Sequence, residues 1–133
     1  MTDQPALTRN QQLVFGALEG AEGPLGAYRI LEELRPAGFR APLQVYRALD
    51  RLVELGLVHR IESLNAFVAC SAGHHHGHGE ETVAFAICEA CGHVTEFVDT
   101  EFERRLGVWC GRHAFRRGRT TLEIRGLCEG CAA

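Results

Sequence analysis

Cys88-Glu89-Ala90-Cys91 and Cys128-Glu129-Gly130-Cys131 are two C-x-x-C pairs, separated by 36 residues. Two residues between cysteines let both sulfurs of a tight knuckle point inward, and two knuckles supply the four thiolates of a closed tetrahedral zinc site. A redox C-x-x-C needs only one pair, and paired disulfides are typical of secreted domains. The two pairs therefore favour a structural zinc that ties the end of the chain to its middle.

Length and composition are compatible with one domain or two small ones. The chain has 133 residues, of which 46% are hydrophobic, enough for a real core. Small domains are marginal alone, and a structural metal is a usual remedy. The first residues resemble no signal peptide and no apolar run reaches membrane-spanning length, so we expect a cytoplasmic protein with reduced thiols and no membrane partner.

The N-terminal part of the chain, residues 1–70, has the pattern of a winged helix-turn-helix. Apolar spacing and caps predict helices from Thr8 to before Gly20, over residues 27–34, and from Pro42 to Gly56. Alternating residues over 57–62 and 66–70 then predict a hairpin. Three short helices followed by a hairpin make this domain a candidate DNA-binding module.

The remainder of the chain predicts a hinge and a second small domain. Residues 71–81 are rich in glycine and histidine and form the expected hinge. In residues 82–133 we expect strands over 83–88, 93–98 and 121–127, with a helix that Thr100 and Glu103 open as a capping box. The fold class is therefore α+β: a winged helix followed by a small zinc-stabilised α/β domain.

The third predicted helix has an exposed face suited to reading DNA. Stepping 100° per residue places Arg47 and Arg51 opposite the apolar stripe, with Gln44 and Tyr46 on its flanks. The net charge is −3, so no global basic field indicates nucleic acid, but all 14 basic residues are arginine, which suits bidentate contacts with phosphate or guanine. Two alternatives stay open: a coding bias toward arginine, and a solvated face on which the arginines pair with Asp50 or Glu54.

The segments Pro42-Leu43-Gln44-Val45-Tyr46-Arg47 and Leu57-Val58-His59-Arg60 resemble the recognition helix and wing of the ferric uptake regulator family, and the cysteine pairs fall where that family has them. The resemblance extends from about Thr8 to Cys131. It implies a homodimeric, metal-dependent repressor with Zn²⁺ as cofactor, in which Tyr46 and Arg47 make base contacts.

The resemblance also implies a sensory metal site at the hinge. The matching positions are His59, Cys70, His78 and Glu96, with His76 as a substitute for His78. A thiolate, two imidazoles and a carboxylate suit tetrahedral zinc, and the thiolate favours Zn²⁺ over Fe²⁺. The chain therefore resembles the zinc uptake regulator branch of the family. Cys110, inside the last predicted helix, is interpreted as a small buried hydrophobe.

These features predict a zinc-responsive repressor, not an enzyme, that binds a pseudo-palindromic operator as a dimer and controls zinc-uptake genes. One alternative keeps the family and changes the signal to iron, manganese or peroxide. Another is a zinc-buffering or zinc-enzyme module that binds no DNA; a catalytic zinc is often announced by H-E-x-x-H, which the sequence lacks, and no small-molecule substrate is expected.

Overall fold

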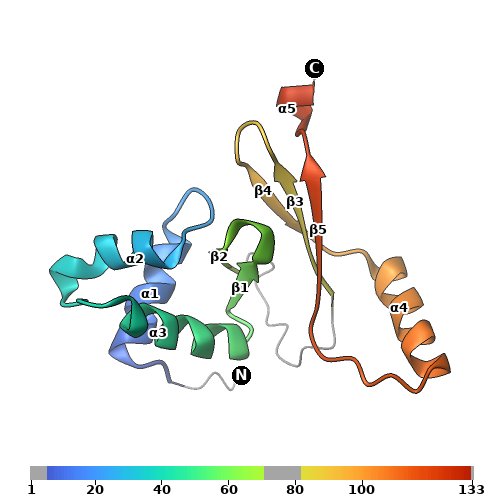
Figure 1. Ribbon diagram of the computed structural model, residues 1–133, viewed down its shortest axis with the longest axis horizontal. Coiled ribbons are helices and arrows are strands. Elements are labelled where there is room, and N and C mark those ends of the chain that lie inside the picture. The colour runs from blue at the N-terminus through green and yellow to red at the C-terminus, as the bar shows by residue number, and fades with distance from the viewer. Residues whose placement is uncertain (1–5, 71–81, 133) are drawn as a thin grey trace. The chain divides into compact units, whose positions relative to one another are not determined.

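The computed structural model describes residues 6–70 and 82–132, drawn in colour in Figure 1. The chain divides into two compact units, Met1–Cys70 and Ser71–Ala133, called here the first and the second unit. Both combine helix and strand, so the chain is of the expected α+β class. Within the described residues, no helix is long and apolar enough to cross a lipid bilayer.

The first unit begins with three helices whose ends are set by their sequences. They are α1 (Arg9–Glu19), α2 (Ala27–Leu34) and α3 (Pro42–Glu54). Thr8 caps α1 through a reciprocal pair of bonds: its Oγ1 accepts from the backbone N–H of Gln11, and the Gln11 side chain accepts from the N–H of Thr8. Pro42 opens α3 at the position where a missing N–H costs nothing, and Gly56 follows the helix at φ +78°.

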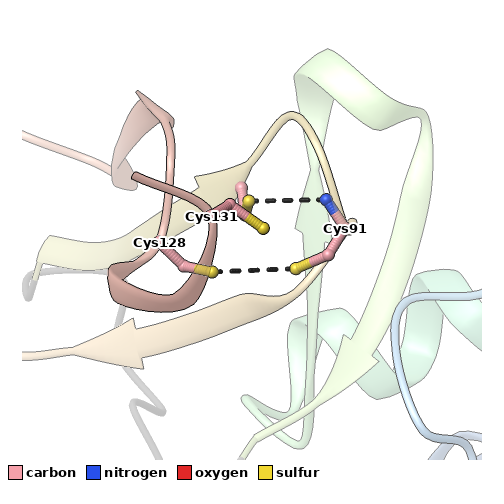
Figure 2. A group of neighbouring side chains, drawn as sticks. Cys91, Cys128 and Cys131 are labelled. Carbon is pink, nitrogen blue, oxygen red and sulfur yellow. Dashed lines mark hydrogen bonds between the residues drawn. The ribbon is translucent and has the colours of Figure 1, made fainter. Parts of the chain in front are cut away.

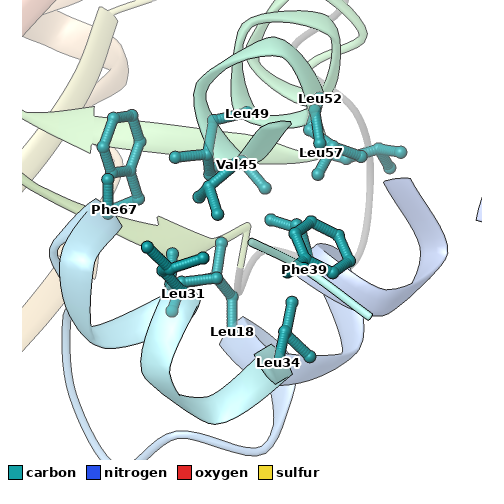
Figure 3. Packing of buried hydrophobic residues seen from close by; sticks show 14 residues of the cluster. Leu18, Leu31, Leu34, Phe39, Val45, Leu49, Leu52, Leu57 and Phe67 are labelled. Atoms are coloured by element: carbon teal, nitrogen blue, oxygen red, sulfur yellow. The ribbon is translucent and has the colours of Figure 1, made fainter. Parts of the chain in front are cut away.

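The three helices pack their apolar stripes into one core, shown in Figure 3. Each helix contributes a residue that is fully buried: Val14 from α1, Ile30 from α2 and Leu49 from α3. Phe39, in the turn before α3, and Phe67, on the hairpin, also belong to this core. The first unit therefore has a contiguous apolar core that uses no metal.

A two-stranded antiparallel wing follows α3. Strand β1 (Val58–Ile61) pairs with β2 (Ala66–Ala69), and Asn65 takes the left-handed conformation, with φ 49°, in the turn between them. Leu25, in the loop before α2, forms a two-bond bridge with Phe67, which adds a third chain segment to the wing. The expected winged helix-turn-helix is present in this unit.

The second unit is built on a mixed three-stranded sheet of order β4-β3-β5. Its elements are β3 (Thr82–Cys88), β4 (Val94–Phe97), α4 (Thr100–Arg112), β5 (Thr120–Gly126) and α5 (Glu129–Ala132). Strand β3 runs antiparallel to β4 and parallel to β5, and its central place makes it the most buried element of the unit. Strands β3 and β5 end, and strand β4 begins, beside the cysteine knuckles at one end of this sheet.

The expected cap of α4 was wrong in one respect. Asp99, not Thr100, is the N-cap residue, and its Oδ1 accepts from the N–H of Phe102 at 3.1 Å. Glu103 does not complete a capping box, because its carboxylate accepts from the N–H of Thr82 at the start of β3 and pairs with Arg117. A tertiary contact has thus taken the side chain that the local pattern assigned to the helix end.

The second unit leaves several large apolar side chains exposed in the single chain. Six large apolar residues are 42 to 59% exposed: Val98, Val108, Trp109, Phe115, Ile124 and Leu127. Trp109 stacks on His113 with ring centroids 4.2 Å apart, and Phe115 meets the tryptophan edge-on at 6.0 Å. Exposure of this extent is typical of a surface that another protein covers.

Candidate functional site

The two cysteine knuckles come together at one end of the second unit. Cys88 ends β3, and Cys91 lies in the turn before β4. Cys128 immediately precedes the short helix α5, and Cys131 lies within it. Their four sulfur atoms all lie within 4.8 Å of one another, as Figure 2 illustrates for the three labelled cysteines. The parallel pairing of β3 with β5 places the second knuckle beside the first, because the C-terminal ends of the two strands lie next to each other.

The spacing of these sulfurs fits zinc. With Zn–S bonds of about 2.3 Å, two ligands of a tetrahedral site lie about 3.8 Å apart. The Sγ atoms of Cys91 and Cys128, one from each knuckle, are 3.8 Å apart. Four thiolates leave no position open for a substrate, so the chemistry of this set is that of a structural site rather than a catalytic one.

The four cysteine sulfurs are close enough to shift one another's pKa values. The backbone N–H of Cys91 donates to the Cys88 sulfur at 3.4 Å, and this bond, with one from the N–H of Cys128, lowers the pKa of Cys88 from 9.0 to about 6. Hydrogen bonds to the sulfurs of Cys128, Cys88 and Cys91 raise the pKa of Cys131 to about 12. Four sulfurs this close share protons unless a divalent cation neutralises the thiolates, which Zn²⁺ would do.

A second pair of metal-ligand residues lies on the wing of the first unit. His59, on β1, is paired in register with Val68, and Cys70 stands two residues after Val68 on the same face. The N–H of Cys70 donates to the carbonyl of Leu57 at 2.9 Å, which continues the strand pairing to that point. A ring nitrogen of the buried His59 and the Cys70 sulfur consequently lie within 4.8 Å of each other.

The other residues expected in the sensory site belong to other segments of the chain. Glu96 is on β4 of the second unit, half-buried and paired in register with Phe85. His76 and His78 fall outside the described residues. Within the first unit alone, the structure thus brings together His59 and Cys70, one imidazole and one thiolate.

The exposed face of α3 carries the residues expected to contact DNA. Arg47 and Arg51 are exposed, whereas Tyr46 is half-buried and packs its ring against the core. The Arg51 guanidinium pairs with Glu54. Gln44 has a task that the sequence analysis did not assign to it: its Oε1 accepts from the backbone N–H groups of Arg40 and Ala41, at 2.6 and 3.0 Å.

Residues 27–125 match the family model described as "Ferric uptake regulator family". The chain belongs to the ferric uptake regulator family. It is 35% identical to the zinc uptake regulation protein of Escherichia coli (strain K12), over 94% of this chain and 72% of the relative. A ferric uptake regulation protein of Neisseria meningitidis is 29% identical over 67% of this chain and 58% of that relative.

Solved structures give the same placement within the ferric uptake regulator family. The crystal structure of holo XcZur superposes with a TM-score of 0.80 at 39% identity, covering 95% of this chain and 86% of that one. A zinc uptake regulator complexed with zinc and DNA superposes with a TM-score of 0.85 at 33% identity, covering 96% and 83%. Among these matches, the zinc uptake regulators share the most extensive similarity with this chain.

Cys110 is half-buried in α4 and lies outside both candidate sets. The sequence interpretation was a small buried hydrophobe inside a helix; the helix is present, and the residue is half-buried rather than buried. The functional side chain that sequence reasoning missed is Glu103, which anchors the start of β3. Its only signal was a carboxylate in the first turn of a helix, which by itself indicates a cap.

Proposed function

We propose that the protein is a zinc-responsive transcriptional repressor that binds a pseudo-palindromic operator as a homodimer and controls zinc-uptake genes. The observation that carries this proposal is the match over nearly the whole chain to zinc uptake regulators, one of them solved with zinc and DNA. The protein acts by binding DNA and metal rather than as an enzyme.

We assign two zinc sites with different tasks. Cys88, Cys91, Cys128 and Cys131 hold a structural zinc, supported by their mutual spacing and by the closed set of four sulfurs. The regulatory zinc is assigned to His59 and Cys70, with Glu96 and His78 as the remaining ligands expected for the family and His76 as the substitute. A thiolate ligand is the reason to prefer Zn²⁺ over Fe²⁺ as the signal.

The DNA-binding face is assigned to α3 and the wing of the first unit. A helix that follows two others and precedes a hairpin is the element that enters the major groove in this class of domain. Arg47 is exposed on that helix, where a guanidinium can bond guanine or phosphate. We place Tyr46 beside it, and its packing against the core fixes the direction of its phenol ring.

We further propose that residues 1–70 form the DNA-binding domain, 71–81 the hinge and 82–133 the dimerisation domain, acting in the cytoplasm. The exposed apolar residues of the second unit, Trp109 and Phe115 among them, supply a surface for the second copy. A two-fold dimer presents its two recognition helices symmetrically, so its operator is a pseudo-palindrome.

Zinc acts on this dimer by population shift. A zinc ion with ligands from both domains fixes the angle between them and selects the arrangement in which both α3 helices reach successive major grooves. Such a shift requires the metal to favour the DNA-competent state by only about 3–5 kcal/mol. No refolding of either domain is needed.

Fluorescence anisotropy tests the proposal with a duplex selected from a random pool by the zinc-loaded protein. Operator affinity should rise with free Zn²⁺, and Arg47→Ala should abolish specific binding without changing the zinc content. Arg29→Ala, which alters an exposed arginine on α2 that pairs with Glu33, is the matched control. DNA affinity that is indifferent to zinc chelation, or a response to Fe²⁺ at lower free metal than Zn²⁺, would overturn the assigned signal.

A further inference from the structure

The arginines of the first unit divide sharply by whether they already have a partner. Five of the seven are engaged: Arg9 donates to the carbonyl of Ala37, and Arg29, Arg35, Arg51 and Arg60 pair with Glu33, Glu32, Glu54 and Glu62. Arg40 and Arg47 are exposed and have no carboxylate partner among the residues that the structure describes. A guanidinium without a local anion is available for an external one.

Both available arginines belong to the same end of α3. Arg40 stands two residues before the first residue of the helix, and Arg47 lies in its second turn. Farther along, the exposed Asp50 and the Arg51–Glu54 pair leave the C-terminal half of this face with one net negative charge. The positive charge is therefore concentrated where the helix dipole is also positive.

Gln44 fixes Arg40 to the helix. Its Oε1 accepts both the N–H of Arg40 and the N–H of Ala41, at 2.6 and 3.0 Å, so the backbone of Arg40 is held against the first turn of α3. The same two bonds occupy this oxygen, which leaves it unable to accept from a base edge. In this arrangement the Gln44 oxygen positions an arginine rather than reading a base.

We propose that Arg40 is a DNA-phosphate contact at the entry of α3 into the major groove, and that Gln44 is the residue that positions it. The inference rests on the proposed DNA-binding function and adds a residue to it. A phosphate is the expected partner because Arg40 precedes the helix, at the rim of the face that carries Arg47, and phosphate contacts set the orientation of a recognition helix.

The test is the salt dependence of DNA binding by the zinc-loaded dimer. One lost phosphate contact reduces the slope of log K against log salt by about 0.9, and reduces affinity about five- to tenfold near 0.1 M salt. We expect Arg40→Gln to reduce the slope and the affinity by these amounts for each protomer. The reduction should be equal for the selected operator and for an unrelated duplex. Arg29→Gln, which removes an exposed arginine on α2 that pairs with Glu33, should leave the slope unchanged.

A double-mutant cycle tests the positioning role of Gln44. Gln44→Leu should lower the slope in the wild-type background but not in the Arg40→Gln background, because its effect acts through Arg40. A loss of helix stability alone would lower affinity equally in both backgrounds and leave the slope unmoved, which would overturn that role.

The failure of this inference is distinct from failure of the proposed function. Zinc-dependent wild-type binding combined with an unchanged slope for Arg40→Gln overturns the phosphate contact alone. Absence of any zinc-dependent binding by the wild-type protein overturns the function and the contact together.

Discussion

Replacing Cys88 with serine should unfold the second unit and leave the first unit folded. Cys88 is buried at the end of β3, and its sulfur accepts the N–H of Cys91 and lies within 4.8 Å of the three other cysteine sulfurs. The substitution removes one of four zinc ligands and the thiolate with the most depressed pKa. We therefore expect the zinc content per chain to fall by one.

The expected loss of stability is large because the second unit has a small apolar core. Among the residues of this unit that the structure describes, 82–132, the buried ones all lie on the single strand β3, with Phe85 at the centre, and α4 buries none. A structural zinc supplies about 10–16 kcal/mol of apparent binding free energy at neutral pH, as much as the whole stability of about 5–15 kcal/mol of an ordinary domain. Loss of the metal thus removes most of the free energy that keeps this unit folded.

Hydrogen exchange with mass spectrometry measures the protection of the amides of both units in one full-length chain, and metal analysis measures its zinc content. In Cys88→Ser, the amides of β3 should exchange quickly while those of α3 stay protected, because the core of the first unit uses no metal. Cys110→Ser is the matched control, since it removes a cysteine outside the four. Wild-type zinc content and full protection of β3 in Cys88→Ser would refute the reasoning.

Three further predictions concern other parts of the chain. Burial alone would raise the pKa of Glu103, but hydrogen bonds from Arg117 and Thr82 outweigh it and hold that pKa below its ordinary 4.5. Glu103→Gln should therefore lower the free energy of unfolding of the second unit by about 1–2 kcal/mol at pH 7, measured by denaturant unfolding. The difference from wild type should disappear as the pH falls through the pKa of Glu103 in the folded protein. A difference that persists in acid would contradict the ion pair. Leu49→Ala, at a fully buried site, should destabilise the first unit by about 2–5 kcal/mol in the same assay and leave the zinc content unchanged. Cys70→Ser should raise the free zinc needed for half-maximal DNA binding about tenfold or more, a loss of about 1.4 kcal/mol, and normal zinc-dependent binding would remove Cys70 from the sensor.

Local signals in the sequence predicted the elements of both units well. Thr8 with Gln11, Pro42 and Gly56 mark helix ends by side-chain and backbone chemistry that acts within a few residues. The spacing of the cysteine pairs predicted a four-sulfur cluster because a C-x-x-C knuckle constrains its own geometry. Such short-range rules do not depend on the rest of the fold.

Features decided by long-range contacts could not be predicted in the same way. Asp99 and Thr100 are both good capping residues, and the choice between them was settled by Glu103, which instead bonds to a strand 21 positions earlier in the chain. Helical periodicity placed Arg47 and Arg51 on one face but could not show that only Arg51 is neutralised by Glu54. The role of Gln44 had a readable signal, because a glutamine at the third helical position often accepts from the N-cap N–H.

The most direct test of the zinc switch is to measure zinc content and operator affinity on the same samples across buffered free Zn²⁺. We expect a tightly held zinc that stays bound throughout and a second, exchangeable zinc whose loss coincides with loss of operator binding. Operator affinity that stays constant while the exchangeable zinc is removed would contradict a zinc-switched repressor.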